Sequence, residues 1–84
     1  MKHFAGEEEV YDLYKKDGKE IVIYESKVYD VSGFIAEHPG GPEKVREYLG
    51  KNIVEPFEEE GHSKYALTLL LKLPVVGEVL SKDL

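Results

Sequence analysis

The segment "HPGG" at residues 38–41 constrains the fold of this chain more than any other. A residue before proline is pushed out of the α region, so a helix capped by Ser32 has to end at His38. The two glycines tolerate positive φ and let other groups approach the backbone closely. Pro42 suits the first position of a new helix, which Gly50 ends. His38 is therefore expected in a turn between two short helices. The apolar face of the second helix is expected to consist of Val45, Tyr48 and Leu49.

A second histidine, His62, occupies the same kind of place. A helical turn that carries Phe57 is expected to end at Gly61. Ser63 can then cap a longer helix, which Pro74 ends. Two helical hairpins, each with an imidazole in its connecting loop, could face each other across a flat group. The apolar residues of the longer helix are Ala66, Leu67, Leu70 and Leu71.

The other segments predict a small sheet. "EEEVYDLYKK" has apolar residues at helical spacing, with acids first and lysines last, and predicts a helix that ends near Gly18. Two β-branched and aromatic runs between Ile21 and Val31, broken by "ES", predict a hairpin. "VVGEV" predicts a final strand, and His3 is expected in a disordered terminus. The predicted class is α+β, with residues 1–84 as one domain and its core at about residues 10–80.

Composition excludes several functions. The 84 residues include no cysteine, so disulfides, thiolate metal sites and a cysteine nucleophile are absent. A domain this short has a marginal core, which favours an added stabiliser such as a cofactor. The net charge of −6 argues against nucleic acid and favours a basic protein partner. No stretch has the length of a membrane span or the apolar core of a signal peptide, so the chain as given is expected to be soluble and not secreted.

The two histidines together indicate a haem site. Neutral imidazole is a good ligand for iron, and two imidazoles fill both axial positions of a haem. An iron with both positions filled transfers electrons and leaves no position for oxygen. Each imidazole is expected to donate its other ring N–H to a backbone carbonyl, with those of Gly41 and Phe57 as candidates. A single histidine in a turn is usually only solvated or hydrogen-bonded, so the argument depends on the pair.

Other readings of these residues stay open. Phe34 and Phe57 are equally compatible with core packing and with lining a pocket. The glutamates near the two histidines can be ordinary solvated residues or an acidic rim that steers a basic redox partner. A peroxidase-like enzyme and a ligand-binding module without haem are the other function classes. The glutamates of the possible rim are Glu43, Glu47, Glu58, Glu59 and Glu60.

The sequences "KVYDVSGFIAEHPGG" and "FEEEGHS", with their histidines 24 positions apart, resemble the cytochrome b5 family from about Val10 to Leu80. The resemblance implies a cytochrome b5-like fold in which two helical hairpins enclose a non-covalently bound b-type haem. It implies that His38 and His62 are the axial ligands and that Ser63 binds a haem propionate. The pocket residues that it implies are Val31, Phe34, Gly40, Gly41, Val45, Phe57, Ala66 and Leu69.

Some positions depart from the family pattern. Ile21 stands where many members have a tryptophan, and Lys44 and Glu60 are polar where the family is often apolar. The segment from Ser63 to Gly77 is one residue longer than in the microsomal proteins. These differences concern the partner surface and the reduction potential and leave the two histidines unchanged.

The resemblance also implies a function. We expect a monomeric one-electron carrier between a flavin-containing reductase and an acceptor such as a lipid hydroxylase, desaturase or oxidase. Family members also occur as domains of larger oxidoreductases, such as fatty-acid hydroxylases, and as tail-anchored proteins. The expected location is the cytoplasm, or the cytosolic face of a membrane if the domain belongs to a longer anchored chain.

Overall fold

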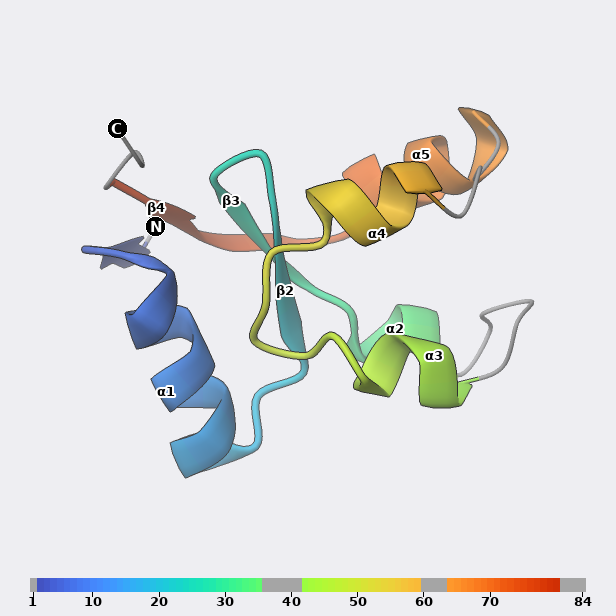
Figure 1. Ribbon diagram of the computed structural model, residues 1–84. Helices are drawn as coiled ribbons and strands as arrows, with labels where there is room; N and C mark the ends of the chain where they lie inside the picture. Colours follow the sequence, from blue (N-terminus) through green and yellow to red (C-terminus); the bar gives the residue numbers. More distant parts are fainter. Residues whose placement is uncertain (1, 36–41, 60–63, 81–84) are drawn as a thin grey trace.

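The structure, a computed structural model, describes residues 2–35, 42–59 and 64–80. A small sheet lies at its centre, with one long helix on one side and four short helices on the other (Figure 1). The α+β class predicted from the sequence is confirmed. The elements are β1 (Lys2–Phe4), α1 (Glu7–Asp17), β2 (Ile21–Tyr24), β3 (Lys27–Asp30), α2 (Ser32–Ile35), α3 (Pro42–Arg46), α4 (Val54–Glu59), α5 (Lys64–Leu71) and β4 (Val75–Val79).

The four strands are arranged in the order β1-β4-β3-β2. The predicted hairpin is β2 and β3, which are antiparallel, with Val22 opposite Tyr29. The residues that join them, Glu25 and Ser26, have φ of 48° and 68°. Positive φ at both turn positions matches the right-handed twist of the two strands and makes a tight two-residue turn. The break seen in the sequence at these two residues is therefore the turn.

Strand β1 is a feature that the sequence did not predict. His3, expected in a disordered terminus, lies in β1 opposite Glu78 of β4, with the two strands parallel. The Leu80 amide donates to the Phe4 carbonyl at 2.8 Å, and the Phe4 side chain is only 2% exposed. Three residues are too few for a sequence pattern, so β1 depends on its pairing with β4 and on burial of Phe4.

The two faces of the sheet carry separate apolar clusters, because side chains alternate along a strand. Ile21 and Ile23 of β2 face α1, and Val22 and Tyr24 face the short helices. We call the first group the α1 cluster and the second the helix-pair cluster. The α1 cluster comprises Phe4, Val10, Ile21, Ile23, Val28 and Val79. The helix-pair cluster comprises Val22, Tyr24, Tyr29, Val31, Ile35, Leu49 and Leu70.

Helix α1 ends where the sequence predicted. Its first turn holds Glu7, Glu8 and Glu9 and its last turn holds two lysines, an order that the helix dipole favours. Gly18 follows with φ of 68°, and its amide donates to the Tyr14 carbonyl at 2.8 Å. This left-handed glycine ends the helix without the steric cost that a side chain would bring.

Helix α3 is shorter than predicted. The regular helix ends at Arg46, and residues 47–50 form turns that lead to Gly50 at φ of 76°. The Gly50 amide donates to the Ile21 carbonyl of β2 at 2.6 Å, which draws the chain away from the helix axis. Tyr48, expected on the apolar face, is therefore 36% exposed, whereas Leu49 is buried.

Strand β2 also fixes the start of α4. The Ile23 amide donates to the Lys51 carbonyl at 2.9 Å, and the Ile53 amide donates to the Ile23 carbonyl at 2.8 Å. The Asn52 side chain accepts a hydrogen bond from the Val54 amide at 2.9 Å and so caps α4. The segment before α4 is thus attached to the sheet by its backbone.

We predict that Gly77→Ala destabilises the fold. An added Cβ would lie 2.6 Å from the Phe4 ring and 2.7 Å from the Lys2 carbonyl oxygen, so β1 and β4 would have to separate. Overpacking of this kind costs about 1–3 kcal/mol of unfolding free energy, measurable by urea denaturation. The control is Gly33→Ala, whose Cβ meets nothing within 4 Å. Equal stability of the two variants would contradict the close packing of β1 on β4.

Candidate functional site

The predicted iron ligands belong to the segments that join the short helices in pairs. His38 falls between α2 and α3 in the sequence, and His62 falls between α4 and α5. The structure therefore describes the helices that precede and follow each predicted ligand in the sequence. The site residues outside the described residues are His38, Gly40, Gly41, His62 and Ser63, together with Glu60 of the acidic rim.

Four predicted pocket residues come together on the helix-pair cluster. Val31 is a buried member of the cluster, 1% exposed. Phe34, Val45 and Phe57 are half-buried and pack against it from α2, α3 and α4. Residues from three helices and the residue that follows β3 thus meet on one face of the sheet, although they are up to 26 positions apart.

Helix α5 contributes residues other than the two predicted pocket residues, Ala66 and Leu69. Leu67 and Leu70 pack in the helix-pair cluster, and Leu69 is half-buried on the same helix. Leu71, expected on the apolar face of this helix, is 51% exposed. Ala66 lies in α5, but its side chain is outside the described part of the structure. The roles of Leu69 and Ala66 in a pocket stay predictions.

Tyr24 is a member of this cluster that the sequence analysis missed. It is 7% exposed, and its ring meets that of Phe57 edge to face, with centroids 5.7 Å apart and planes at 66°. The signal was present in "IVIY", because alternation along a strand places Tyr24 on the same face as Val22. All four residues of this run are apolar or aromatic, so the sequence pattern did not show which face of the strand packs on the short helices.

Burial keeps the phenols of this cluster neutral. Desolvation raises the pKa of Tyr24, and the charges of Glu25 and Glu58 raise it further. Desolvation and Glu25 also raise the pKa of Tyr29 above its ordinary value of 10.0. Because these phenols ionise less readily in the folded chain than in the unfolded chain, they leave the free energy of unfolding independent of pH below pH 10 and lower it as the pH rises above that value.

Asp30 organises the start of α2, a role that the sequence analysis gave to Ser32. The Asp30 carboxylate accepts hydrogen bonds from the Ser32 amide at 2.9 Å and from the Ser32 hydroxyl at 2.7 Å. These two bonds lower the pKa of Asp30 from its ordinary value of 3.8. Partial burial raises the pKa and the charge of Lys19 lowers it, but both effects are smaller than those of the two bonds. The hydroxyl donates to Asp30 because the carboxylate is the stronger acceptor. Asp30 thereby fixes the helix that precedes His38.

Acidic residues flank the helix pairs. Glu43 lies in α3, Glu47 in the turn that follows α3, and Glu58 in α4, and all three are exposed. Arg46 lies among them and pairs with Glu20 at 3.5 Å. Glu59 is the last residue of α4, but its side chain lies outside the described part of the structure. The exposed carboxylates fit the predicted acidic rim and equally an ordinary solvated surface.

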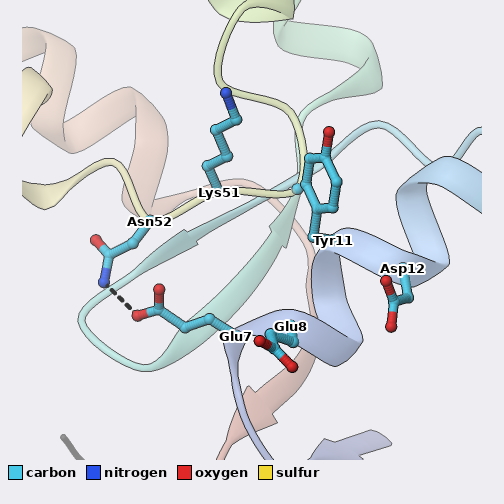
Figure 2. Close-up of a pocket in the computed structure, with 7 residues that line it drawn as sticks. Glu7, Glu8, Tyr11, Asp12, Lys51 and Asn52 are labelled. Carbon is cyan, nitrogen blue, oxygen red and sulfur yellow. Dashed lines mark hydrogen bonds between the residues drawn. The ribbon is translucent and has the colours of Figure 1, made fainter.

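An open pocket of about 410 Å³ lies elsewhere, between α1 and the segment before α4 (Figure 2). Four of its lining residues, Glu7, Glu8, Asp12 and Lys51, carry charges, and the Asn52 side-chain amide donates to Glu7 across it at 2.8 Å. None of the predicted site residues lines it. The lining residues are Glu7, Glu8, Tyr11, Asp12, Gly50, Lys51 and Asn52.

The chain matches the family described as "Cytochrome b5-like Heme/Steroid binding domain" over residues 6–80. The chain therefore belongs to the cytochrome b5-like haem/steroid-binding domain family, as the resemblance of its two histidine motifs implied. In the described residues, no helix combines the length and the apolar character that crossing a membrane requires.

Individual relatives agree with this assignment. Cytochrome b5 of Rattus norvegicus is 45% identical over 69 residues, which cover 81% of this chain and 51% of that protein. An NADH-cytochrome b5 reductase-like protein, alnC, of Emericella nidulans is 40% identical over 63 residues, which cover 75% of this chain and 14% of that protein. The solved cytochrome b5 of Ostreococcus tauri virus 2 has a TM-score of 0.68 and 28% identity, covering 92% of this chain and 84% of that chain. This chain spans about half the length of the cytochromes b5 of Rattus norvegicus and Musca domestica.

The described residues fit a flat, apolar group. Phe34, Val45 and Phe57 remain half-buried although they pack on a buried cluster, so each keeps some exposed apolar surface, and each is within four positions of a histidine-containing segment in the sequence. A macrocycle such as haem offers matching apolar faces, and two imidazoles match its two axial positions. The side chains present are therefore the kinds that a bis-histidine haem site requires.

We predict that Asp30→Ala lowers the unfolding free energy by about 1 kcal/mol at neutral pH, the usual cost of a lost cap. Because the pKa of Asp30 is lowered by folding, its contribution is present above pH 3.8 and is lost as the pH falls below that value. Urea denaturation at neutral pH and near pH 2 should therefore show the difference between variant and parent shrinking in acid. Asp12→Ala, at an exposed position of α1, is the control. A difference independent of pH would contradict this role of Asp30.

Proposed function

We propose that this chain binds one b-type haem non-covalently, with His38 and His62 as its axial ligands, and carries one electron at a time. The observation that carries the proposal is the helix-pair cluster, on which apolar side chains from both helix pairs meet. Each pair is joined by a segment that contains one histidine. The bound haem would supply an iron that changes oxidation state while both axial positions stay filled.

The residues of the chain would prepare this site in three ways. Val31, Phe34, Val45 and Phe57 exclude water and offer an apolar surface. Asp30 fixes the start of α2, and the β2 backbone fixes the start of α4, so both ligand-bearing segments begin from anchored positions. Exclusion of water and fixed ligands limit the rearrangement that accompanies a change of charge at the iron.

The proposed electron donor is a flavin-containing reductase, and the proposed acceptor is an oxidoreductase such as a lipid hydroxylase, desaturase or oxidase. The similarity to part of a reductase-like protein supports a role beside such a reductase, either as a separate chain or as a domain of a larger oxidoreductase. The cytosol or the cytosolic face of a membrane is the proposed location.

A ligand-binding module without electron transfer is the second candidate, because the family description names steroid as well as haem. The two candidates differ in the spectrum of the chain. A haem titration that gives a low-spin, six-coordinate spectrum supports the electron carrier. A folded chain that gives no haem spectrum supports the second candidate.

We predict that His38→Ala and His62→Ala each weaken haem binding by more than the roughly 10- to 100-fold that loss of a supporting partner costs. Each variant removes one axial ligand, so the remaining complex should be high-spin and should bind carbon monoxide when reduced. Absorption spectra during haem titration measure both effects. His3→Ala is the matched control, because His3 is exposed on β1. Unchanged binding by either ligand variant would contradict the ligation.

The exposed acidic residues favour a redox partner whose docking surface is basic. Glu43, Glu47 and Glu58 are exposed on or beside α3 and α4, next in sequence to the proposed ligand segments, and the chain carries a net charge of −6. Carboxylates of this kind attract a basic partner and orient its approach, and salt screens the attraction.

We predict that the rate at which NADH-cytochrome b5 reductase reduces the haem-loaded chain falls as ionic strength rises. The triple variant Glu43→Gln, Glu47→Gln and Glu58→Gln should be slower at low salt and less sensitive to salt, because the steering charges are removed. The control, Glu8→Gln, Asp12→Asn and Asp17→Asn, removes the same charge from exposed positions of α1. Stopped-flow kinetics measure both. Equal rates for the two triple variants would contradict a partner surface at α3 and α4.

A further inference from the structure

Helix α4 is short, and strand β2 contacts it or the segment before it at two places. At its start, the Ile23 backbone bonds to the segment of residues 51–53 in both directions. One residue further along β2, the Tyr24 side chain contacts the ring of Phe57 in the body of the helix. The backbone bonds fix where α4 begins, and the ring contact fixes how the helix is turned about its axis.

Phe57 is five positions before His62 in the sequence, and Glu59 ends α4. Only two residues separate the end of α4 from His62 in the sequence, so the position and orientation of α4 limit the places that His62 can reach. The Tyr24 ring lies in the helix-pair cluster at 7% exposure, where its neighbours leave it little freedom. A fixed ring against the edge of Phe57 is a rigid support for that helix.

We infer that Tyr24 is a positioning residue for the second haem ligand: through its contact with Phe57 it sets the orientation of α4 and so of the chain that leads to His62. This inference rests on the proposed function. It gives Tyr24 a role that composition and motif spacing did not assign.

The aromatic ring, and not the hydroxyl, would carry this role. The contact with Phe57 is ring to ring, with the planes at 66°. A phenol with the ordinary pKa of 10.0 is already neutral in the physiological range, and burial raises the pKa of Tyr24 further, so the hydroxyl brings no charge to the site. Phenylalanine should therefore replace Tyr24, and leucine, which fills space without a ring, should not.

Tyr29 offers a matched control in the same cluster. It is 5% exposed, so Tyr29→Leu removes a buried tyrosine ring of the same kind. Tyr29 lies on β3 opposite Val22, and among the described residues it makes no ring contact with Phe57. General loss of packing should affect both leucine variants, whereas loss of ligand positioning should affect only Tyr24→Leu.

The experiment compares the parent, Tyr24→Phe, Tyr24→Leu and Tyr29→Leu in two states. In the ferric haem-loaded chains, electron paramagnetic resonance reports ligand orientation, and transfer of haem to excess apomyoglobin reports its release. Tyr24→Leu should shift the g values and release haem about tenfold faster, the order of effect of a supporting partner. Tyr24→Phe and Tyr29→Leu should keep the g values of the parent and release haem at a rate within about twofold of it.

In the haem-free chains, amide hydrogen exchange tests the same contact without the cofactor. Tyr24→Leu should speed exchange in α4 relative to α3, and Tyr29→Leu should not. Equal effects of the two leucine variants, or parental g values in Tyr24→Leu, would overturn the inference while leaving the proposed function intact. A parent chain that binds no haem would overturn the proposed function and the ligand-positioning role together.

Discussion

Strand β2 is buried on both faces, and the arrangement of the other elements depends on this burial. Ile21 and Ile23 hold α1 on one side, and Val22 and Tyr24 form part of the surface on which the helix pairs pack. The Ile21 and Ile23 backbones also bond to residues 50–53, between α3 and α4. A single four-residue strand thus connects the long helix, the sheet and both helix pairs (Figure 1).

Packing on the sheet explains how such short helices are stable. Helices α2, α3, α4 and α5 have four, five, six and eight residues, lengths at which an isolated helix is unstable in water. Their apolar residues pack on the helix-pair cluster, while Asp30 and Asn52 fix the starts of α2 and α4. A haem between the two pairs would add further apolar contact to a domain whose core is small. The proposed electron transfer would benefit from the same arrangement, because helices anchored at their starts limit movement when the iron changes charge.

The sequence predicted the features that depend on local chemistry. Gly18 ends α1, the pair Glu25 and Ser26 forms the hairpin turn, and Pro42 begins α3, all because backbone preferences act within a few residues. It failed where distant segments decide the outcome. Strand β1 forms by pairing with β4, and α3 ends early because Gly50 bonds to Ile21. For the site, Val31, Phe34, Val45 and Phe57 were predicted and meet on one cluster. Tyr24 was missed because an entirely apolar strand does not reveal which face its residues share.

A haem bound as proposed would lie on the helix-pair side of the sheet, between the segments that contain His38 and His62. Proton NMR of the ferric haem-loaded chain can locate the haem, because the paramagnetic iron shifts the signals of nearby side chains. We expect large shifts for Val31, Phe34, Val45 and Phe57, and small shifts for Val10 and Ile21 of the α1 cluster. Large shifts in the α1 cluster, or no shifted signals after haem is added, would contradict this placement of the haem.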